Sequence, residues 1–248
     1  MHSIANLQGE IILQDENTVS VDTVIISDIH LGSEVSRPKQ VVEMLEKYKF
    51  KRLILLGDIF DHLNFARLKK THWNMLSYIR KLSNPKNFID VIWVEGNHDE
   101  GLTEIMSHLI GIEVLKEYTW EIKDKKILAI HGHQFDRFLN ENVVISSAAS
   151  FVYDRIQRWG KDKQTIARYL KKKSKGWLRL SNKVADGAVE YGRHLKANIV
   201  ICGHTHKEAE IPYTDVNMVY YNTGCWTDLP STYIVVHSDG GIEIKYME

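Results

Sequence analysis

The stretch Val-Ile-Ile-Ser-Asp-Ile-His at residues 24–30 joins a run of β-branched apolar residues directly to two side chains that can bind a metal ion. Four further stretches repeat this plan: LILLGDIFD at 53–61, VIWVEGNHD at 91–99, ILAIHGH at 127–133 and IVICGHTH at 199–206. Short, uninterrupted apolar runs of this kind are typical of strands buried on both faces. Ligands of α/β sheets bind outside the carboxyl ends of the strands, so the sequence predicts an α/β fold whose five polar clusters meet there.

The spacing within two of these clusters suits metal binding. Asp28 and His30 are two residues apart, so in an extended chain their side chains leave on the same side and can hold one ion. His204 and His206 repeat this arrangement. Both pairs are therefore candidate chelating pairs.

Two other clusters place a ligand directly after a glycine. Asp58 follows Gly57 and Asn97 follows Gly96, and glycine permits the tight turns that aim a side chain from a strand end into a crevice. A carboxylate has two oxygens and can bridge two cations. Asp58 is the natural bridging residue.

These residues provide ligands for two adjacent metal ions. We assign one ion to Asp28, His30, Asp58 and His206, and the other to Asp58, Asn97, His131 and His204. Mixed imidazole and oxygen ligands suit Mn, Fe or Zn better than Mg or Ca, and we expect two divalent ions, with Mn²⁺ preferred and Fe or Zn as alternatives.

The chemistry predicted for such a pair is metal-assisted hydrolysis of a phosphate ester. Two ions roughly 3.5–4 Å apart can clamp a phosphoryl group and lower the pKa of a bridging water. His98 lies next to Asn97 but outside the ligand set, so we predict that it is the catalytic residue, as a general acid or as a charge partner for the reacting phosphate. Asn97 and His98 are also predicted to contact the substrate.

At these residues the chain resembles the calcineurin-like metallophosphoesterases, whose motifs are Asp-x-His, Gly-Asp, Gly-Asn-His-Asp/Glu, His-Gly or Gly-His, and Gly-His-x-His. The resemblance covers about residues 21–236. It implies a four-layer α/β/β/α sandwich with a dinuclear metal site.

Within that superfamily the chain is most similar to the UDP-2,3-diacylglucosamine pyrophosphatase group, which makes a lipid A precursor. The similarity includes the motif spacing, the long basic segment between HGH and GHTH, and YYNTGCW at 220–226. Members of that group have Arg at the position of His98 and Asp at the position of His133. The resemblance implies hydrolysis of the pyrophosphate bond of a UDP-linked lipid, with release of UMP.

Length and composition favour one enzyme domain over residues 1–248. The 32 Lys and Arg residues balance 32 Asp and Glu residues, which argues against nucleic acid as the partner. Cys202 and Cys225 are the only cysteines, and no apolar run approaches the roughly 20 residues that span a bilayer. We expect a cytoplasmic protein that contacts the inner membrane face peripherally.

A helical, basic insert is predicted at about residues 140–196. Residues 145–159 and 184–195 each form an apolar stripe at helical spacing, so at least two amphipathic helices are expected. Between residues 155 and 179 there are ten Lys or Arg residues and one acid. We predict a lid that binds an anionic lipid substrate through Lys171, Lys172 and Lys175, although a solvated surface explains such a charge run as well.

Other elements follow from periodicity and turn residues. We expect a strand at 11–13, helices at 38–49 and 68–82, and antiparallel strands at 218–221, 233–236 and 242–245, with a hairpin turn at Asp239-Gly240.

Two other functions fit the same residues. A phosphodiesterase or nucleotidase that acts on a soluble nucleotide would use the basic lid for phosphates alone. A binding scaffold on the same fold that has lost catalysis is expected to have eroded ligands, whereas here the ligand set is complete.

Overall fold

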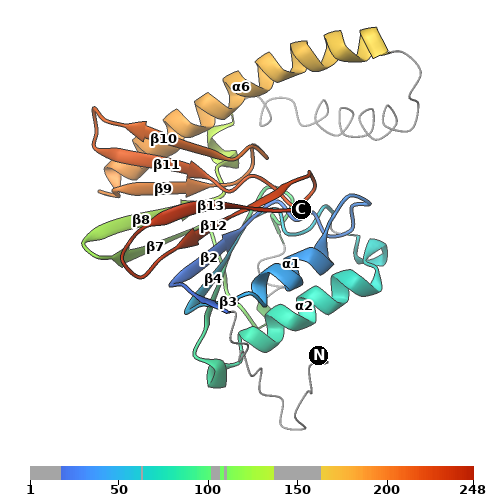
Figure 1. The fold of residues 1–248 in the computed structure, drawn as a ribbon, viewed down its shortest axis with the longest axis vertical. Coiled ribbons are helices and arrows are strands. Elements are labelled where there is room, and N and C mark those ends of the chain that lie inside the picture. Colours follow the sequence, from blue (N-terminus) through green and yellow to red (C-terminus); the bar gives the residue numbers. More distant parts are fainter. Residues whose placement is uncertain (1–17, 63, 102–106, 109–110, 137–162) are drawn as a thin grey trace.

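The computed structural model describes residues 18–62, 64–101, 107–108, 111–136 and 163–248, and only the backbone of residues 163–177. The predicted strand at 11–13 and the first predicted helix of the insert, at 145–159, lie outside the described residues. Two β-sheets pack face to face in the centre of the molecule, and helices cover their outer faces (Figure 1).

The first sheet has six strands in the order β13-β12-β2-β4-β5-β6. They are β2 (Thr23–Ile26), β4 (Arg52–Leu56), β5 (Asp90–Val94), β6 (Val114–Leu115), β12 (Ser231–Val236) and β13 (Ile242–Met247). Strands β2, β4, β5 and β6 are parallel, while β12 runs antiparallel to both β2 and β13. The predicted hairpin is confirmed, because Gly240 has a φ of +87° between β12 and β13.

The second sheet has five strands in the order β10-β11-β9-β8-β7. They are β7 (Glu117–Ile122), β8 (Lys125–Ile130), β9 (Ile199–Cys202), β10 (Ala209–Tyr213) and β11 (Met218–Asn222). The strand predicted at 218–221 pairs antiparallel with β10, as expected, but parallel with β9. The edge strands β7 and β10 were not predicted, because half-exposed strands carry many polar residues and little apolar signal.

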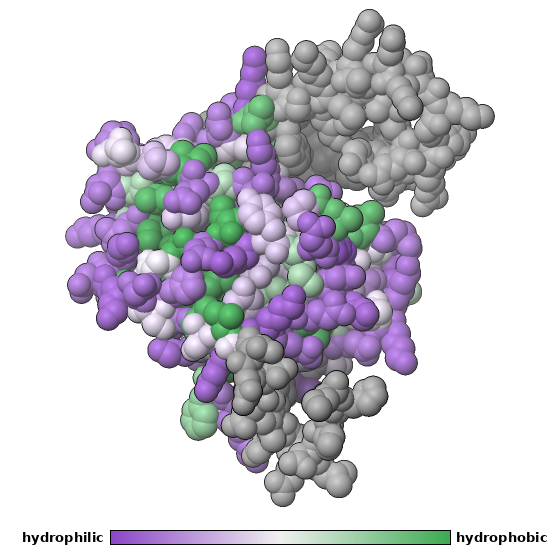
Figure 2. Space-filling view, viewed as in Figure 1, coloured by the Kyte–Doolittle hydropathy of each residue, from purple (hydrophilic) through white to green (hydrophobic). Residues whose placement is uncertain are grey.

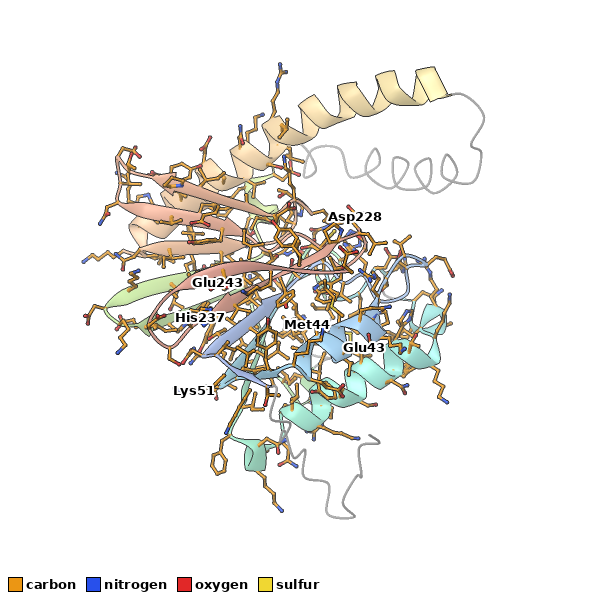
Figure 3. All side chains as sticks on the ribbon, viewed as in Figure 1. Glu43, Met44, Lys51, Asp228, His237 and Glu243 are labelled. Atoms are coloured by element: carbon orange, nitrogen blue, oxygen red, sulfur yellow. The ribbon has the colours of Figure 1, made fainter. Side chains whose placement is uncertain are left out.

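Helices α1 (Pro38–Leu45) and α2 (Lys70–Leu82) pack on the outer face of the first sheet, and Met44 lies between α1 and that sheet (Figure 3). Helix α6 (Lys163–His194) packs on the outer face of the second sheet. The four-layer α/β/β/α arrangement is confirmed. Short 3-10 turns occur at Phe65–Arg67, Pro85–Asn87 and His133–Phe135.

The central strands are mostly apolar because both of their faces are covered, and charged residues such as Arg52 and Asp90 occur only near their N-terminal ends. In β4, Leu53 and Leu55 pack toward the helices, whereas Ile54 packs between the two sheets. In β9, Ile201 packs between the sheets and Val200 packs toward α6. Alternate residues of a strand point to opposite faces of the sheet. Each strand therefore contributes side chains both to the apolar layer between the two sheets and to the layer between its own sheet and the helices that cover it.

Helix α1 ends at Leu45 instead of the predicted Lys49. Residues Tyr48–Lys49 form strand β3, which pairs in parallel with β1 (Val19–Ser20). The hydroxyls of Tyr48 and Tyr233 lie 2.9 Å apart. Tertiary contacts therefore decide the end of this helix, although the helical spacing of apolar residues continues through Tyr48.

The second predicted helix of the insert is the C-terminal part of α6, which spans 32 residues. Val184 and Ala188 are buried against the second sheet, and the N-terminal half of the helix continues beyond that sheet (Figure 1). Despite its length, neither α6 nor any other described helix is apolar enough to cross a membrane. The face in Figure 2 is mostly hydrophilic where it is described, with small apolar groups between the polar side chains.

Candidate metal centre

The five polar clusters follow the carboxyl ends of β2, β4, β5, β8 and β9, and the sheet packing brings these ends together. Six side chains form two groups of three, Asp28 with His30 and His206, and Asp58 with His131 and His204. Within each group, one ligand atom of every residue lies within 4.8 Å of the others. These groups follow our two-ion assignment, except that Asp58 falls in the second group only.

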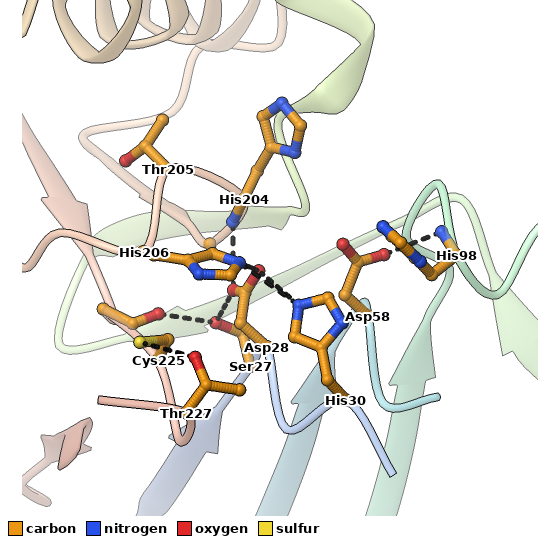
Figure 4. Close-up of polar contacts among 12 residues, drawn as sticks. Ser27, Asp28, His30, Asp58, His98, His204, Thr205, His206, Cys225 and Thr227 are labelled. Carbon is orange, nitrogen blue, oxygen red and sulfur yellow. Dashed lines mark hydrogen bonds and ion pairs between the residues drawn. The ribbon is translucent and has the colours of Figure 1, made fainter. Parts of the chain in front are cut away.

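In the first group two imidazoles face one carboxylate (Figure 4). The Nε2 atom of His206 lies 3.1 Å from Oδ1 of Asp28 and 3.2 Å from Nε2 of His30. Oδ1 of Asp28 lies 3.9 Å from Nε2 of His30. Three ligand atoms thus converge on one point from β2 and from the loop after β9.

The second group is almost entirely enclosed. The Nε2 atom of His131 lies 3.4 Å from Oδ2 of Asp58, and the rings of His131 and His204 are 5.3 Å apart. All three residues are buried. The Nδ1 atom of His131 lies 2.9 Å from the carbonyl oxygen of Leu56, which can only accept, so Nδ1 donates to that oxygen and Nε2 is the nitrogen that faces Asp58.

The donor set fits a pair of divalent cations. Oδ1 of Asp28 and Nε2 of His131 are buried and form no well-aligned hydrogen bond among the described residues, although each lies beside its ion-pair partner, His206 and Asp58 respectively. Unsatisfied buried polar atoms are costly, and a native structure keeps them where a ligand completes them. Imidazole nitrogen and carboxylate oxygen are the ligands that Mn, Fe and Zn share.

The ionisation of the site residues also fits a pair of divalent cations. Burial alone would raise the pKa of Asp28, but the charge of His206 holds it below its usual value. Burial would likewise raise the pKa of Asp58, but His131 holds it well below its usual value. In turn, burial would lower the pKa of His131, but Asp58 raises it to about 9. Both carboxylates are therefore anionic and require positive charge beside them.

The backbone at this site is strained. Five of the six grouped residues have φ in the left-handed region: Asp28 (+50°), His30 (+51°), Asp58 (+51°), His204 (+67°) and His206 (+55°). Each such non-glycine conformation costs roughly 1–3 kcal/mol and persists only where its surroundings enforce it. The extended geometry expected for the Asp-x-His and His-x-His pairs is therefore wrong. Asp28 and His30 still fall in one group, whereas His204 and His206 fall in different groups and do not chelate one ion as a pair.

Two motif glycines are needed because other groups approach them closely. A Cβ atom on Gly96 would lie 2.2 Å from Oδ1 of Asp58. On Gly203 it would lie 2.6 Å from Oδ2 of Asp28. Gly96 has no left-handed φ, so its function is space for the Asp58 carboxylate and not the turn that we predicted.

Asp99 supports the loop that carries Asp58. Its buried carboxylate accepts hydrogen bonds from the backbone N–H groups of Ile59 (3.1 Å) and Phe60 (3.0 Å). Burial, together with the charge of Asp58, raises the pKa of Asp99 to about 7. Through these two hydrogen bonds, Asp99 holds the GNHD turn (residues 96–99) against the GDIFD turn (residues 57–61).

Asp136 is a candidate positioning residue that the sequence analysis missed. Its buried carboxylate lies 3.3 Å from Nε2 of His204. If Nε2 donates to this carboxylate, Nδ1 of His204 is left to bind metal, and such a partner orients the ring and strengthens the ligand. The sequence feature that could have identified Asp136 is an acidic residue five positions after His131, in HGHQFD.

Asn97 and His98 lie exposed in the turn after β5. The backbone N–H of His98 donates to Oδ1 of Asp58 at 2.8 Å, and its ring stands edge-on to that of His30 at 5.0 Å. Nδ1 of His98 lies 2.8 Å from the carbonyl oxygen of Asp61, so Nδ1 carries a proton and Nε2 is the free nitrogen. The assignment of Asn97 as a metal ligand stays a prediction.

His98 also belongs to a third group, with His30 and Asp61, whose ligand atoms lie within 4.8 Å of one another. In this group the carboxylate of Asp61 is already paired with Arg67 at 2.9 Å. The group shares His30 with the first group. The role of His98 outside the ligand set therefore stays a prediction that experiment must decide.

Lys171, Lys172 and Lys175 lie in α6, and their side chains are outside the described residues. Their predicted contact with substrate is untested by the structure. His133 lies next to the second group, with its ring 5.5 Å from that of His131 and 6.4 Å from that of His204.

A family profile described as the calcineurin-like phosphoesterase superfamily domain matches residues 21–241. This match covers most of the chain, so the chain belongs to that superfamily, and it is a metal-dependent phosphoesterase. A comparison with curated proteins finds no significant match.

Several solved structures are similar in fold. One is Yfce, a phosphoesterase from E. coli, with 14% sequence identity and a TM-score of 0.49; the match covers 91% of this chain and 99% of Yfce. Another is an archaeal phosphodiesterase with 15% identity and a TM-score of 0.48, and that match covers 91% of this chain and 99% of the phosphodiesterase. A third is Vps29 from Entamoeba histolytica, complexed with Zn²⁺, with 16% identity and a TM-score of 0.46; the match covers 91% of this chain and 97% of Vps29. At TM-scores below 0.5 these similarities add nothing to the family assignment.

If Asp58 bridges the two ions, Asp58→Ala will weaken the binding of both, because one carboxylate is lost from each site. His206→Ala will mainly empty the first site and His131→Ala the second. Elemental analysis of the purified proteins measures the metal content per chain. A full load of two ions in Asp58→Ala would refute the bridging assignment.

Asp136→Ala is expected to lower metal affinity by about 10–100-fold, the usual effect of removing a carboxylate that orients a metal-binding histidine. Titration with Mn²⁺ against a competing chelator measures this affinity. Asp186→Ala is the matched control, because Asp186 accepts a hydrogen bond from Tyr213 (2.7 Å) away from the two groups. Equal affinities for Asp136→Ala and the control would show that Asp136 does not position His204.

Proposed function

We propose that this member of the calcineurin-like phosphoesterase superfamily hydrolyses the pyrophosphate bond of UDP-2,3-diacylglucosamine, or of a similar UDP-linked lipid, and releases UMP. The motif series, its spacing and the basic segment between HGH and GHTH support this substrate. The observation that carries the proposal is the attachment of a basic helix to the turn that bears His131.

Helix α6 packs directly on that turn. A Cβ atom on Gly132 would lie 3.1 Å from Val184, and one on Gly187 would lie 2.9 Å from Phe135. The rings of Phe135 and Tyr191 are 6.0 Å apart. The helix is therefore anchored beside the metal centre by its C-terminal half.

The N-terminal half of α6 carries most of the positive charge. Residues 163–178 include six Lys or Arg residues and no Asp or Glu. This half continues beyond the second sheet (Figure 1). Positive charge on a helix held beside a phosphoesterase centre suits an anionic substrate and an anionic membrane surface. We propose that the enzyme acts in the cytoplasm, in peripheral contact with the inner membrane face.

Two divalent ions, with Mn²⁺ as the proposed metal, would supply positive charge for the phosphoryl oxygens and a water of lowered pKa. Asp28, His30, Asp58, Asn97, His131, His204 and His206 would hold them. His98 stands at the exposed side of the centre, with Nδ1 on the carbonyl of Asp61 and Nε2 free. When Nε2 also carries a proton, His98 can stabilise the charge of the reacting phosphate or donate that proton to the leaving oxygen.

Hydrolysis of a soluble nucleotide or phosphodiester is the second candidate. His98 and His133 stand where lipid pyrophosphatases have Arg and Asp, and this difference favours a different substrate. The deciding experiment incubates the Mn²⁺-loaded protein with UDP-diacylglucosamine, UDP-N-acetylglucosamine and bis(p-nitrophenyl) phosphate. Preferred turnover of the acylated compound supports the lipid pyrophosphatase, whereas turnover of the soluble compounds alone supports the alternative. No turnover of any of them would contradict both.

His98→Ala is expected to lower kcat by about 10²–10⁴-fold with unchanged metal content, the usual range for a positioned acid or base. His62→Ala is a control, because His62 is another exposed histidine of the neighbouring loop. Steady-state kinetics and elemental analysis are measured on the same preparations. If His98→Ala instead loses metal and regains normal turnover once metal is resupplied, His98 is a metal ligand.

Neutralising Lys171, Lys172 and Lys175 together is expected to impair hydrolysis of the lipid-linked diphosphate and binding to anionic vesicles more than hydrolysis of bis(p-nitrophenyl) phosphate. Both effects will shrink with rising salt, because charges more than about 8 Å apart are largely screened at physiological ionic strength. Lys39, Lys47 and Lys86, all outside the insert, provide a control triple variant. Equal losses on both substrates would instead indicate a structural role for the insert.

A further inference from the structure

A cavity of about 110 Å³ lies beside the metal centre, between α6, the loop after β9, and strands β10 and β11. Thr205 lines it, and this residue stands between His204 and His206 in the sequence. None of the seven candidate metal ligands lines the cavity. It is therefore a separate space that shares one loop with the metal centre.

The polar groups of the cavity have unused hydrogen-bonding capacity. Oγ of Ser181, on α6, is buried and has no partner among the described residues. Oγ1 of Thr205 accepts a hydrogen bond from Nδ2 of Asn222 at 3.2 Å, which leaves its own proton available. Two hydroxyls, one from α6 and one from the loop after β9, can thus bind a polar ligand.

The rest of the lining is mainly apolar, with Asn182 and Asn222 as further polar residues, and the exposed Lys207 lies at the rim. Leu178 of α6 is 45% exposed, and Ile211 and Tyr220 contribute side chains from β10 and β11. Lys207, exposed and next to His206, lies on the side of the cavity that adjoins the metal centre. A ligand in this cavity would meet apolar surface, two hydroxyls and, toward the metal centre, one positive charge.

The size restricts what can enter. A cavity of roughly 150 Å³ holds a single benzene ring, whereas pockets for whole drug-sized ligands measure roughly 300–1,000 Å³. A cavity of about 110 Å³ that opens at its rim therefore suits one six-membered ring. It is too small for a purine or for two acyl chains.

We infer that this cavity binds the pyrimidine base of a nucleoside diphosphate-linked substrate while the phosphates lie at the metal centre. This inference rests on the proposed function and names the part of the substrate that the cavity recognises. The base offers carbonyl and N–H groups to Ser181 and Thr205, and its flat faces meet Leu178, Ile211 and Tyr220. An acyl chain would leave both hydroxyls buried without partners, at the cost of their desolvation.

Direct binding tests this inference without any turnover. Isothermal titration of the metal-free protein with uridine, and with adenosine as the larger base, is compared among the wild type, Ser181→Leu and Leu178→Glu. Ser181→Leu fills the cavity at a helical position, and Leu178→Glu replaces an apolar wall at a half-exposed position. Lys183→Leu is the matched control, because it adds the same side chain on α6 at an exposed position that does not line the cavity.

The wild type and Lys183→Leu are expected to bind uridine in preference to adenosine, and the two cavity variants to bind uridine at least about tenfold more weakly. With Mn²⁺, the KM for UDP-N-acetylglucosamine is expected to rise at least about tenfold more than the KM for bis(p-nitrophenyl) phosphate in the cavity variants. Circular dichroism checks that each variant is folded.

The outcomes separate this inference from the proposed function. If UDP-diacylglucosamine is hydrolysed but uridine does not bind, or binds equally to all folded variants, the cavity is not a base site and the proposed function stands. If uridine binds selectively and the cavity variants lose it, the inference holds even where the acylated substrate is not hydrolysed. Stronger binding of adenosine than of uridine would overturn the inference.

Discussion

The carboxylate of Asp28 is buried where the two sheets meet, and the loops of both sheets bond to this residue. Its Oδ2 accepts the backbone N–H of His204 at 3.0 Å, and its own N–H donates to the carbonyl of Gly57 at 3.1 Å. The N–H of Trp226 donates to its carbonyl at 3.0 Å. The buried anion is satisfied by the N–H of His204, while the two backbone bonds join the loops after β4 and β11 to the same residue. Asp28 thus links loops of both sheets in a junction at the metal centre.

The junction explains why a strained backbone persists at the site. Left-handed conformations at Asp28, His30 and Asp58 are unfavourable for the isolated loops, yet the N–H of His30 donates to the carbonyl of Asp58 at 3.0 Å and locks the two loops together. The strands beneath them are buried on both faces and cannot shift to relieve the strain. The ligands are therefore held close to their binding geometry before a cation arrives, which is the arrangement that a metal site needs.

The same rigidity connects α6 to the chemistry. The turn that carries His131 also supplies Gly132 and Phe135, which contact α6 at Val184 and Gly187. A shift of the helix would press on this turn, because Gly132 has a φ of +105° and little room beside it. The C-terminal half of α6 thus contacts the turn that carries a metal-centre residue, and its charged N-terminal half lies beyond the second sheet.

The sequence by itself determined the buried strands, the order of the five polar clusters and the residues that converge on the metal centre. These follow from local rules: continuous apolar runs predict strands that are covered on both sides, and their carboxyl ends share one edge. The sequence did not determine the end of α1, where contacts of Tyr48 override the helical period, or the edge strands β7 and β10, whose apolar signal is weak. Only the tertiary structure decided that Gly96 makes room for Asp58, that Asp99 and Asp136 support the ligands, and that a cavity adjoins Thr205. The first three depend on residues about 40 to 70 positions apart in the chain approaching within a few ångströms, and the cavity lies between three different elements, which no local pattern records.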